Sequence, residues 1–117
     1  MIKVPDAGYV TVSSDYEQMR IPFESIMYIE ARKSYVILHT FREKVISNTP
    51  LRVLLYDLPV RLFIQTHRNY VVAISQVNAL EPSRVTLINN EKVPLSKNYR
   101  KPLINTLLEL GVIDKGF

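Results

Sequence analysis

Short runs of β-branched and aromatic residues, each followed by turn-forming residues, dominate this 117-residue chain. Runs of four to six residues with apolar side chains at alternate positions are typical of short β-strands. Between two of the later runs, Asn89-Asn90 predicts a tight hairpin, because asparagine tolerates a positive φ. The predicted strands cover residues 9–13, 17–22, 26–31, 35–40, 43–48, 62–66, 70–73, 77–80, 85–88 and 92–95.

The apolar spacing changes to a helical one in the middle of the chain. Four leucines between residues 51 and 58 recur at i, i+3, i+4 and i+7, which predicts a short helix with one apolar face. Thr49 is the expected N-cap, Pro50 the expected first helical residue, and Pro59 the residue that ends the helix.

A second helix is predicted at the end of the chain, where leucines fall at 103, 107 and 110. Pro102 favours a start at that residue rather than at Lys97, and Gly111 is a natural C-terminal cap. Nine or ten short strands with two helices predict a mostly β fold, a β-rich member of the α+β class.

Composition and length narrow the class of protein. A chain of 117 residues is sufficient for one domain with one core, and 47% hydrophobic with 22% charged residues is typical of a globular protein. There is no cysteine, no run of 18 apolar residues, and no apolar signal sequence at the N-terminus. These features predict a soluble, cytoplasmic protein without disulfides and without a membrane segment.

Basic residues are concentrated in two parts of the sequence. The whole chain carries a net charge of +4, while residues 84–102 alone hold five basic residues and one acidic residue. A second basic group consists of Arg32, Lys33, Arg42 and Lys44 around Glu43. This distribution is the one expected if one face of the protein meets a polyanion.

Two strands end in polar or basic residues of a kind that contacts nucleic acid. Residues 63–73 read Phe-Ile-Gln-Thr-His-Arg-Asn-Tyr-Val-Val-Ala, and residues 93–97 read Val-Pro-Leu-Ser-Lys. Upstream, residues 26–31 read Ile-Met-Tyr-Ile-Glu-Ala and are followed by Tyr35-Val36. The three blocks, in this order, resemble the LytTR family of bacterial DNA-binding domains. The family typically shows Ile-x-Tyr-Ile-Glu-Ala, then Phe-x-Arg-x-His-Arg-Ser-x-x-Val-Asn, then Val-Pro-x-Ser-Arg.

The resemblance covers roughly residues 9–108 and implies an elongated arrangement of small antiparallel sheets that places loops into successive major grooves of duplex DNA. It implies a DNA contact at Arg68, support from His67 and Asn69, and a base contact at Lys97, where the family usually has Arg. Three positions depart from the family pattern, namely Gln65, Asn69 and Ala73. The expected DNA-binding residues are Lys33, Ser34, Tyr35, His67, Arg68, Asn69, Lys97, Asn98, Arg100 and Lys101.

Signals for catalysis are missing from the sequence. It contains three glycines and none of the glycine-rich or nucleophile motifs of common enzymes, and His39 and His67 lack metal-ligand spacing. We therefore expect no catalytic residue, no cofactor and no metal. Glu30 and Tyr28 are interpreted as structural residues, Glu30 pairing with a basic neighbour or with backbone N–H groups.

The expected domain organisation is a tether at residues 1–8, a LytTR-like domain at 9–111 and a tail at 112–117. The resemblance implies a weak homodimer that strengthens on double-stranded DNA. It also implies an upstream receiver domain, which this chain is too short to contain, so the sequence is either an effector domain or a stand-alone regulator. Two alternatives remain open: a β-rich protein-interaction module with a basic edge, and an RNA binder that reads shape.

Overall fold

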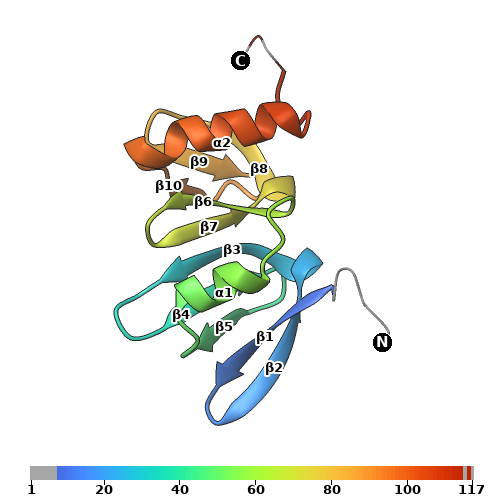
Figure 1. Ribbon diagram of the computed structural model, residues 1–117, viewed down its shortest axis with the longest axis vertical. Coiled ribbons are helices and arrows are strands. Elements are labelled where there is room, and N and C mark those ends of the chain that lie inside the picture. Colours follow the sequence, from blue (N-terminus) through green and yellow to red (C-terminus); the bar gives the residue numbers. More distant parts are fainter. Residues whose placement is uncertain (1–7, 115, 117) are drawn as a thin grey trace.

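The computed structural model describes residues 8–114 and residue 116, so most of the expected tether lies outside the described residues. Ten strands form three antiparallel sheets, accompanied by two α-helices and two short 3-10 turns at Phe23–Ser25 and Ile74–Gln76 (Figure 1). The strands are β1 (Tyr9–Ser14), β2 (Glu17–Pro22), β3 (Ile26–Ala31), β4 (Val36–Thr40), β5 (Lys44–Ser47), β6 (Phe63–His67), β7 (Tyr70–Ala73), β8 (Val77–Leu80), β9 (Arg84–Leu87) and β10 (Lys92–Pro94). The helices are α1 (Leu51–Asp57) and α2 (Lys97–Glu109).

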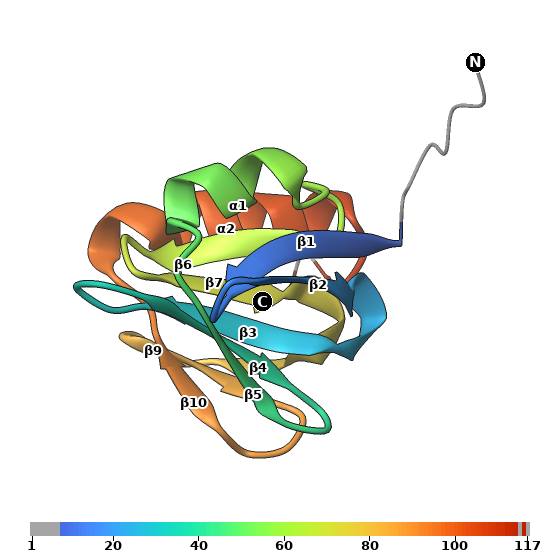
Figure 2. The ribbon, with the colours of Figure 1, turned by 90° about the horizontal axis from the view of Figure 1, so that it is seen from below.

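The central sheet has five strands in the order β5-β4-β3-β7-β6. A hairpin of β1 and β2 adjoins it at one end of the molecule, and a three-stranded sheet in the order β10-β9-β8 adjoins it at the other. The principal extents of 47 × 37 × 25 Å make the arrangement elongated. Figure 2 shows α1 on one side of the central strands and β9 and β10 on the other.

Strand β3 is buried along nearly its whole length because two separate hydrophobic clusters cover it. Ile26 and Ile29 belong to a cluster with α1 and the β1–β2 hairpin, while Met27 and Tyr28 belong to a cluster with α2 and the three-stranded sheet. A register shift between Ile26 and Tyr28 accommodates this change of face. A strand covered on both faces reads as a continuous apolar run, which is how residues 26–29 appear in the sequence.

The mostly β fold with small antiparallel sheets, one short internal helix and a C-terminal helix is confirmed. Two helix starts were predicted wrongly. Helix α2 begins at Lys97, five residues before Pro102, which lies inside the helix. A proline there removes one backbone donor, and Leu103 and Leu107, both fully buried, hold the helix against the core regardless.

Helix α1 begins at Leu51 after Pro50 as its N-cap, rather than with Thr49 as N-cap. The Thr49 hydroxyl accepts a hydrogen bond from the Ser13 backbone N–H at 3.0 Å, so it connects the helix start to β1. Gly111 is confirmed as the residue that ends α2: its φ is +71°, and its N–H donates to the Leu108 carbonyl.

Tyr28 links the central sheet to the three-stranded sheet. Its ring stacks on His39 with centroids 4.0 Å apart, and its hydroxyl donates to Glu91 Oε2 at 2.8 Å. Burial, followed by the hydrogen bond and the charge of Glu91, raises the pKa of this phenol well above its usual value of 10.0.

The raised pKa of Tyr28 predicts a loss of stability in alkaline solution. Because the folded-state pKa exceeds the unfolded one, the stabilisation is complete below pH 10 and is lost as the pH rises above it. Between about pH 9 and about pH 11, the unfolding free energy of the wild type should fall by roughly 1.4 kcal/mol more than that of Tyr28→Phe. Urea unfolding at the two pH values measures the difference. Equal losses for both proteins would contradict the prediction, and Tyr16→Phe at an exposed turn is the control.

Candidate nucleic-acid interface

Three connecting segments come together along one edge of the molecule. They are the β3–β4 turn at residues 32–35, the β6–β7 turn at residues 68–69, and the start of α2. The Ala31 N–H donates to the Asn69 carbonyl at 2.7 Å, which joins the first turn to the second. The Ser96 N–H donates to the Thr66 carbonyl at 2.9 Å, which joins the start of α2 to β6. Backbone hydrogen bonds therefore fix the order of the three segments along this edge (Figure 1).

The β3–β4 turn is closed by a hydrogen bond from the Arg32 N–H to the Tyr35 carbonyl at 2.7 Å. Lys33 and Ser34 are exposed at its apex. Tyr35 lies in the turn rather than in β4 and is 39% exposed, so the predicted start of this strand at residue 35 is one residue early. All three side chains are accessible to a partner.

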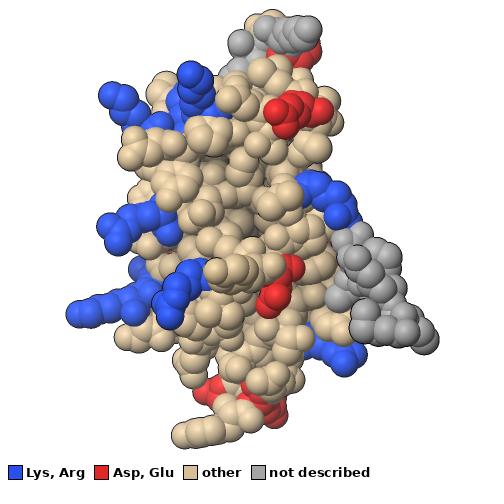
Figure 3. Space-filling view, in the orientation of Figure 1, with Lys and Arg blue, Asp and Glu red and all other residues tan. Residues whose placement is uncertain are grey.

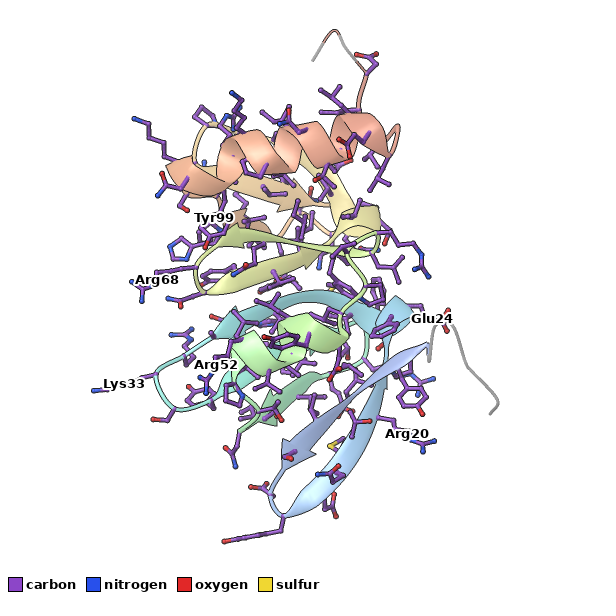
Figure 4. The ribbon with its side chains drawn as sticks, in the orientation of Figure 1. Arg20, Glu24, Lys33, Arg52, Arg68 and Tyr99 are labelled. Atoms are coloured by element: carbon purple, nitrogen blue, oxygen red, sulfur yellow. The ribbon has the colours of Figure 1, made fainter. Side chains whose placement is uncertain are left out.

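The β6–β7 turn owes its shape to His67. Nδ1 of His67 accepts a hydrogen bond from the Asn69 N–H at 3.1 Å, and the ring packs edge-on against Tyr70 at 5.5 Å. An accepting Nδ1 leaves the ring proton of the neutral imidazole on Nε2. Arg68, at the apex, is exposed and points outward (Figure 4). The turn thus uses His67 and Asn69 to hold itself together and presents Arg68.

The start of α2 presents positive groups toward the same edge. Lys97 and Asn98 are exposed in the first turn of this 13-residue helix, and that turn contains no acidic residue. The N–H groups and the dipole at a helix N-terminus attract anions. Lys101 is also exposed, whereas Arg100 is half-buried and donates to the Glu81 carbonyl at 2.7 Å. One of its guanidinium nitrogens is therefore occupied within the protein.

Beneath the first two turns lies the buried carboxylate of Glu30. Its Oε1 is 2.7 Å from His39 Nε2, and its Oε2 is 3.0 Å from the Arg32 guanidinium. The Tyr70 hydroxyl donates to Oε2 at 3.3 Å. Burial, then the negative charge of Glu30, raises the pKa of Tyr70. Glu30 therefore contacts Arg32 in the first turn and Tyr70 directly after the second, as expected for a structural carboxylate, and links the two.

Comparisons with known proteins identify the family. The family model described as LytTr DNA-binding domain matches residues 16–108. The chain belongs to the LytTr DNA-binding domain family. It is 31% identical over 88 residues to the sensory transduction protein LytT of Bacillus anthracis, and equally to that of Bacillus cereus. Each match covers 71% of this chain and 36% of the relative, so the chain spans about a third of these relatives.

A solved structure has the same fold. It is described as the LytTr DNA-binding domain of a putative methyl-accepting/DNA response regulator from Bacillus cereus. The TM-score is 0.75 with 24% sequence identity, over 86% of this chain and 97% of that one. Membership of the family makes this chain a DNA-binding domain of the type found in transcription regulators, which is not a catalytic class.

Arg52 is a positive residue of the LytTr domain edge that sequence reasoning missed. It lies in the first turn of α1, and together with residues 31–36 it lines a depression of about 270 Å³. In Figure 4 Arg52 lies on the same side as Lys33 and Arg68. The pairing of the two strands could have located Arg52. Val36 at the start of β4 pairs with Ser47 at the end of β5, so the chain that follows β5 begins beside the β3–β4 turn.

The structure divides the second basic group of the sequence, Arg32, Lys33, Arg42 and Lys44, between two ends of β4. Arg42 and Lys44 lie at the β4–β5 turn, at the opposite end of β4 from Lys33, so the expectation that this whole group lies on one polyanion-binding face is wrong. Arg84 and Lys92 both pair with Glu81, at 3.2 and 2.9 Å. The hydrogen bond from Lys92, with a second from Thr86, lowers the pKa of Glu81.

Positive charge nevertheless remains along the edge of the LytTr domain. Figure 3 shows lysine and arginine side chains along one border of the molecule, where Figure 4 places Lys33, Arg52 and Arg68. Within the described part of the chain, no ion pair involves these three residues, Lys97 or Lys101. Among residues 8–114 and 116 no cluster of His, Asp or Glu could hold a metal ion, and no helix is long and apolar enough to cross a membrane.

Proposed function

We propose that this LytTr domain is a sequence-specific duplex-DNA-binding transcription regulator that inserts its edge loops into successive major grooves of repeated half-sites. The observation that carries the proposal is the alignment of three turns on one edge by backbone hydrogen bonds, each turn presenting a basic side chain. The long axis of 47 Å exceeds the spacing of about 34 Å between successive major grooves on one side of B-DNA. Residues 9–111 form the DNA-binding unit.

The side chains at the turn apices would read bases. Arg68 is exposed and has the forked donors that match guanine O6 and N7, and Lys97 reaches the same atoms as a single charge. Lys33, Ser34 and Tyr35 would contact a second groove. His67 and Asn69 support the Arg68 turn through their mutual hydrogen bond.

The surrounding groups would bind phosphates and supply most of the affinity. Asn98 and Lys101 lie on the first two turns of α2, and Arg100 keeps donors beyond the one used on Glu81. Arg52 adds a further phosphate contact beside the β3–β4 turn. Two domains on neighbouring half-sites would bind as a weak pair that DNA strengthens.

Selection from a random duplex library tests the proposal. The purified domain is incubated with the library at near-physiological salt and with excess non-specific duplex, and the bound DNA is sequenced. We expect a short motif repeated at a spacing of one or two helical turns. Recovery of no motif, with binding lost to the competitor, would overturn the proposal and favour a protein partner. Preference for an A-form competitor would instead indicate RNA.

A further inference from the structure

A second surface of the domain lies far from the DNA-facing edge. A groove of about 600 Å³ runs between the β1–β2 hairpin and the β4–β5 turn. Its apolar lining includes Phe41, whose side chain is 58% exposed, together with Met19 and the buried Ile21 and Val45. An exposed aromatic residue in a groove is a common feature of protein-binding surfaces.

The rim of this groove carries two cations and two anions. Arg20, Arg42, Glu24 and Glu43 all line the groove and are all exposed. No ion pair within 4.0 Å involves any of the four among the described residues. Arg20 lies over the ring of Tyr9 at 4.7 Å, which restricts its guanidinium to the rim. These four side chains therefore add no net charge to the groove, and none has an ion-pair partner within the described part of the chain.

This combination fits a second copy of the same chain. A two-fold interface brings a surface against itself, so it must be complementary to itself. Equal numbers of unpaired cations and anions around an apolar centre meet that requirement, because each arginine can face a glutamate of the other copy. A polyanion or a strongly acidic peptide would meet two carboxylates. We propose that two copies associate through this groove, with Phe41 at the centre and the four charged residues forming ion pairs across the two-fold axis.

The location of the groove gives the pair a distinct geometry. The groove lies at the β4–β5 turn, whereas the DNA-facing edge lies at the opposite end of β4. In Figure 4, Arg20 and Glu24 are on one side of the molecule and Lys33 and Arg68 are on the other. A pair joined through the groove would present its two DNA-binding edges outward, and would hold two separate DNA segments. This second step rests on the proposed function.

Sedimentation without DNA tests the interface itself. One variant combines Arg20→Glu with Arg42→Glu, and the other combines Glu24→Arg with Glu43→Arg. Protein concentrations should extend to about 1 mM, because small interfaces commonly form only weak, transient complexes. Each variant alone should self-associate at least about tenfold more weakly than the wild type, since like charges then face each other. An equimolar mixture of the two should associate again, because each acidic rim then faces a basic one.

Two results would overturn the interface: a wild type that stays monomeric throughout, or a mixture that associates no better than its components. All four positions are exposed, and circular dichroism verifies that the variants fold. Phe41→Ser, which leaves the net charge unchanged, should also weaken association.

A capture assay tests the bridging step. Protein is first bound to an immobilised duplex, and a second, labelled duplex is then added. The wild type should capture it, and Phe41→Ser should bind one duplex normally but fail to capture another. Normal capture by Phe41→Ser would overturn bridging through the groove. Failure of the wild type to bind a single duplex would instead contradict the proposed function, while the sedimentation result would still stand.

Discussion

Replacing either Arg68 or Lys97 with alanine is expected to lower the affinity for the selected DNA motif by roughly 5- to 150-fold, or 1–3 kcal/mol, the range for a good base contact. Arg68 is the exposed apex of the β6–β7 turn, and Lys97 the first residue of α2. Each change should also relax the base preference at one position of the motif. Fluorescence anisotropy with the selected duplex and with single-base variants measures both effects.

Lys44→Ala is the matched control, because it removes the same charge from an exposed residue of β5 away from the edge loops. We expect it to reduce affinity by no more than about threefold, which corresponds to under 1 kcal/mol of screened, long-range attraction. Lys101→Ala should weaken binding to all sequences alike and reduce the salt slope by about one. Equal losses for Lys44→Ala and Lys97→Ala would mean that net charge, rather than the edge, determines binding.

The second large effect is expected from Glu30→Ala, which should lower the free energy of unfolding by about 2–4 kcal/mol, because it leaves buried hydrogen-bonding groups without an acceptor. The buried His39 ring loses its partner at 2.7 Å, and Arg32 and Tyr70 lose the group that joins their turns. Urea unfolding measures the loss. Glu17→Ala is the control, because it removes an exposed carboxylate from β2. A loss under about 0.5 kcal/mol, the usual limit for surface substitutions, would show that the network does not stabilise the fold.

Glu30→Ala should also weaken DNA binding under conditions in which the protein is still folded. The reason is positional: Glu30 contacts Arg32 in one turn and Tyr70 directly after the other. Glu30→Gln, which retains one acceptor oxygen, should recover part of the stability. Full affinity in a folded Glu30→Ala protein would mean that the two turns keep their spacing through the backbone alone.

The strand pattern was predictable because alternation and turn residues are local properties of a sequence. Residues 26–31 and 70–73 read as strands before any partner was known, and both are strands in the fold. The start of α2 was not predictable in this way. Pro102 has a strong local preference for a helix start, but distant contacts hold the turn before it: Tyr99 packs against the second hydrophobic cluster, and Arg100 donates to the Glu81 carbonyl at 2.7 Å.

The candidate site was predictable only in part, for a similar reason. The motif blocks locate the turns at Lys33, Arg68 and Lys97, because each block is continuous in the sequence. Arg52 and Arg42 depend on strand order: antiparallel pairing brings Arg52 to the edge and places Arg42 at the far end of β4. Charge counts along the sequence cannot distinguish these two positions, because they carry no information about strand pairing.

The backbone hydrogen bonds that join the turns have a consequence for how such a domain can change. The Ala31–Asn69 and Ser96–Thr66 bonds involve only main-chain atoms, so the spacing between the turns does not depend on the side chains at their apices. Substitutions at positions such as Arg68 or Lys97 can therefore alter which bases are preferred while the length of DNA covered stays the same. A lineage of such proteins can acquire new target sites one side chain at a time, without rebuilding the scaffold.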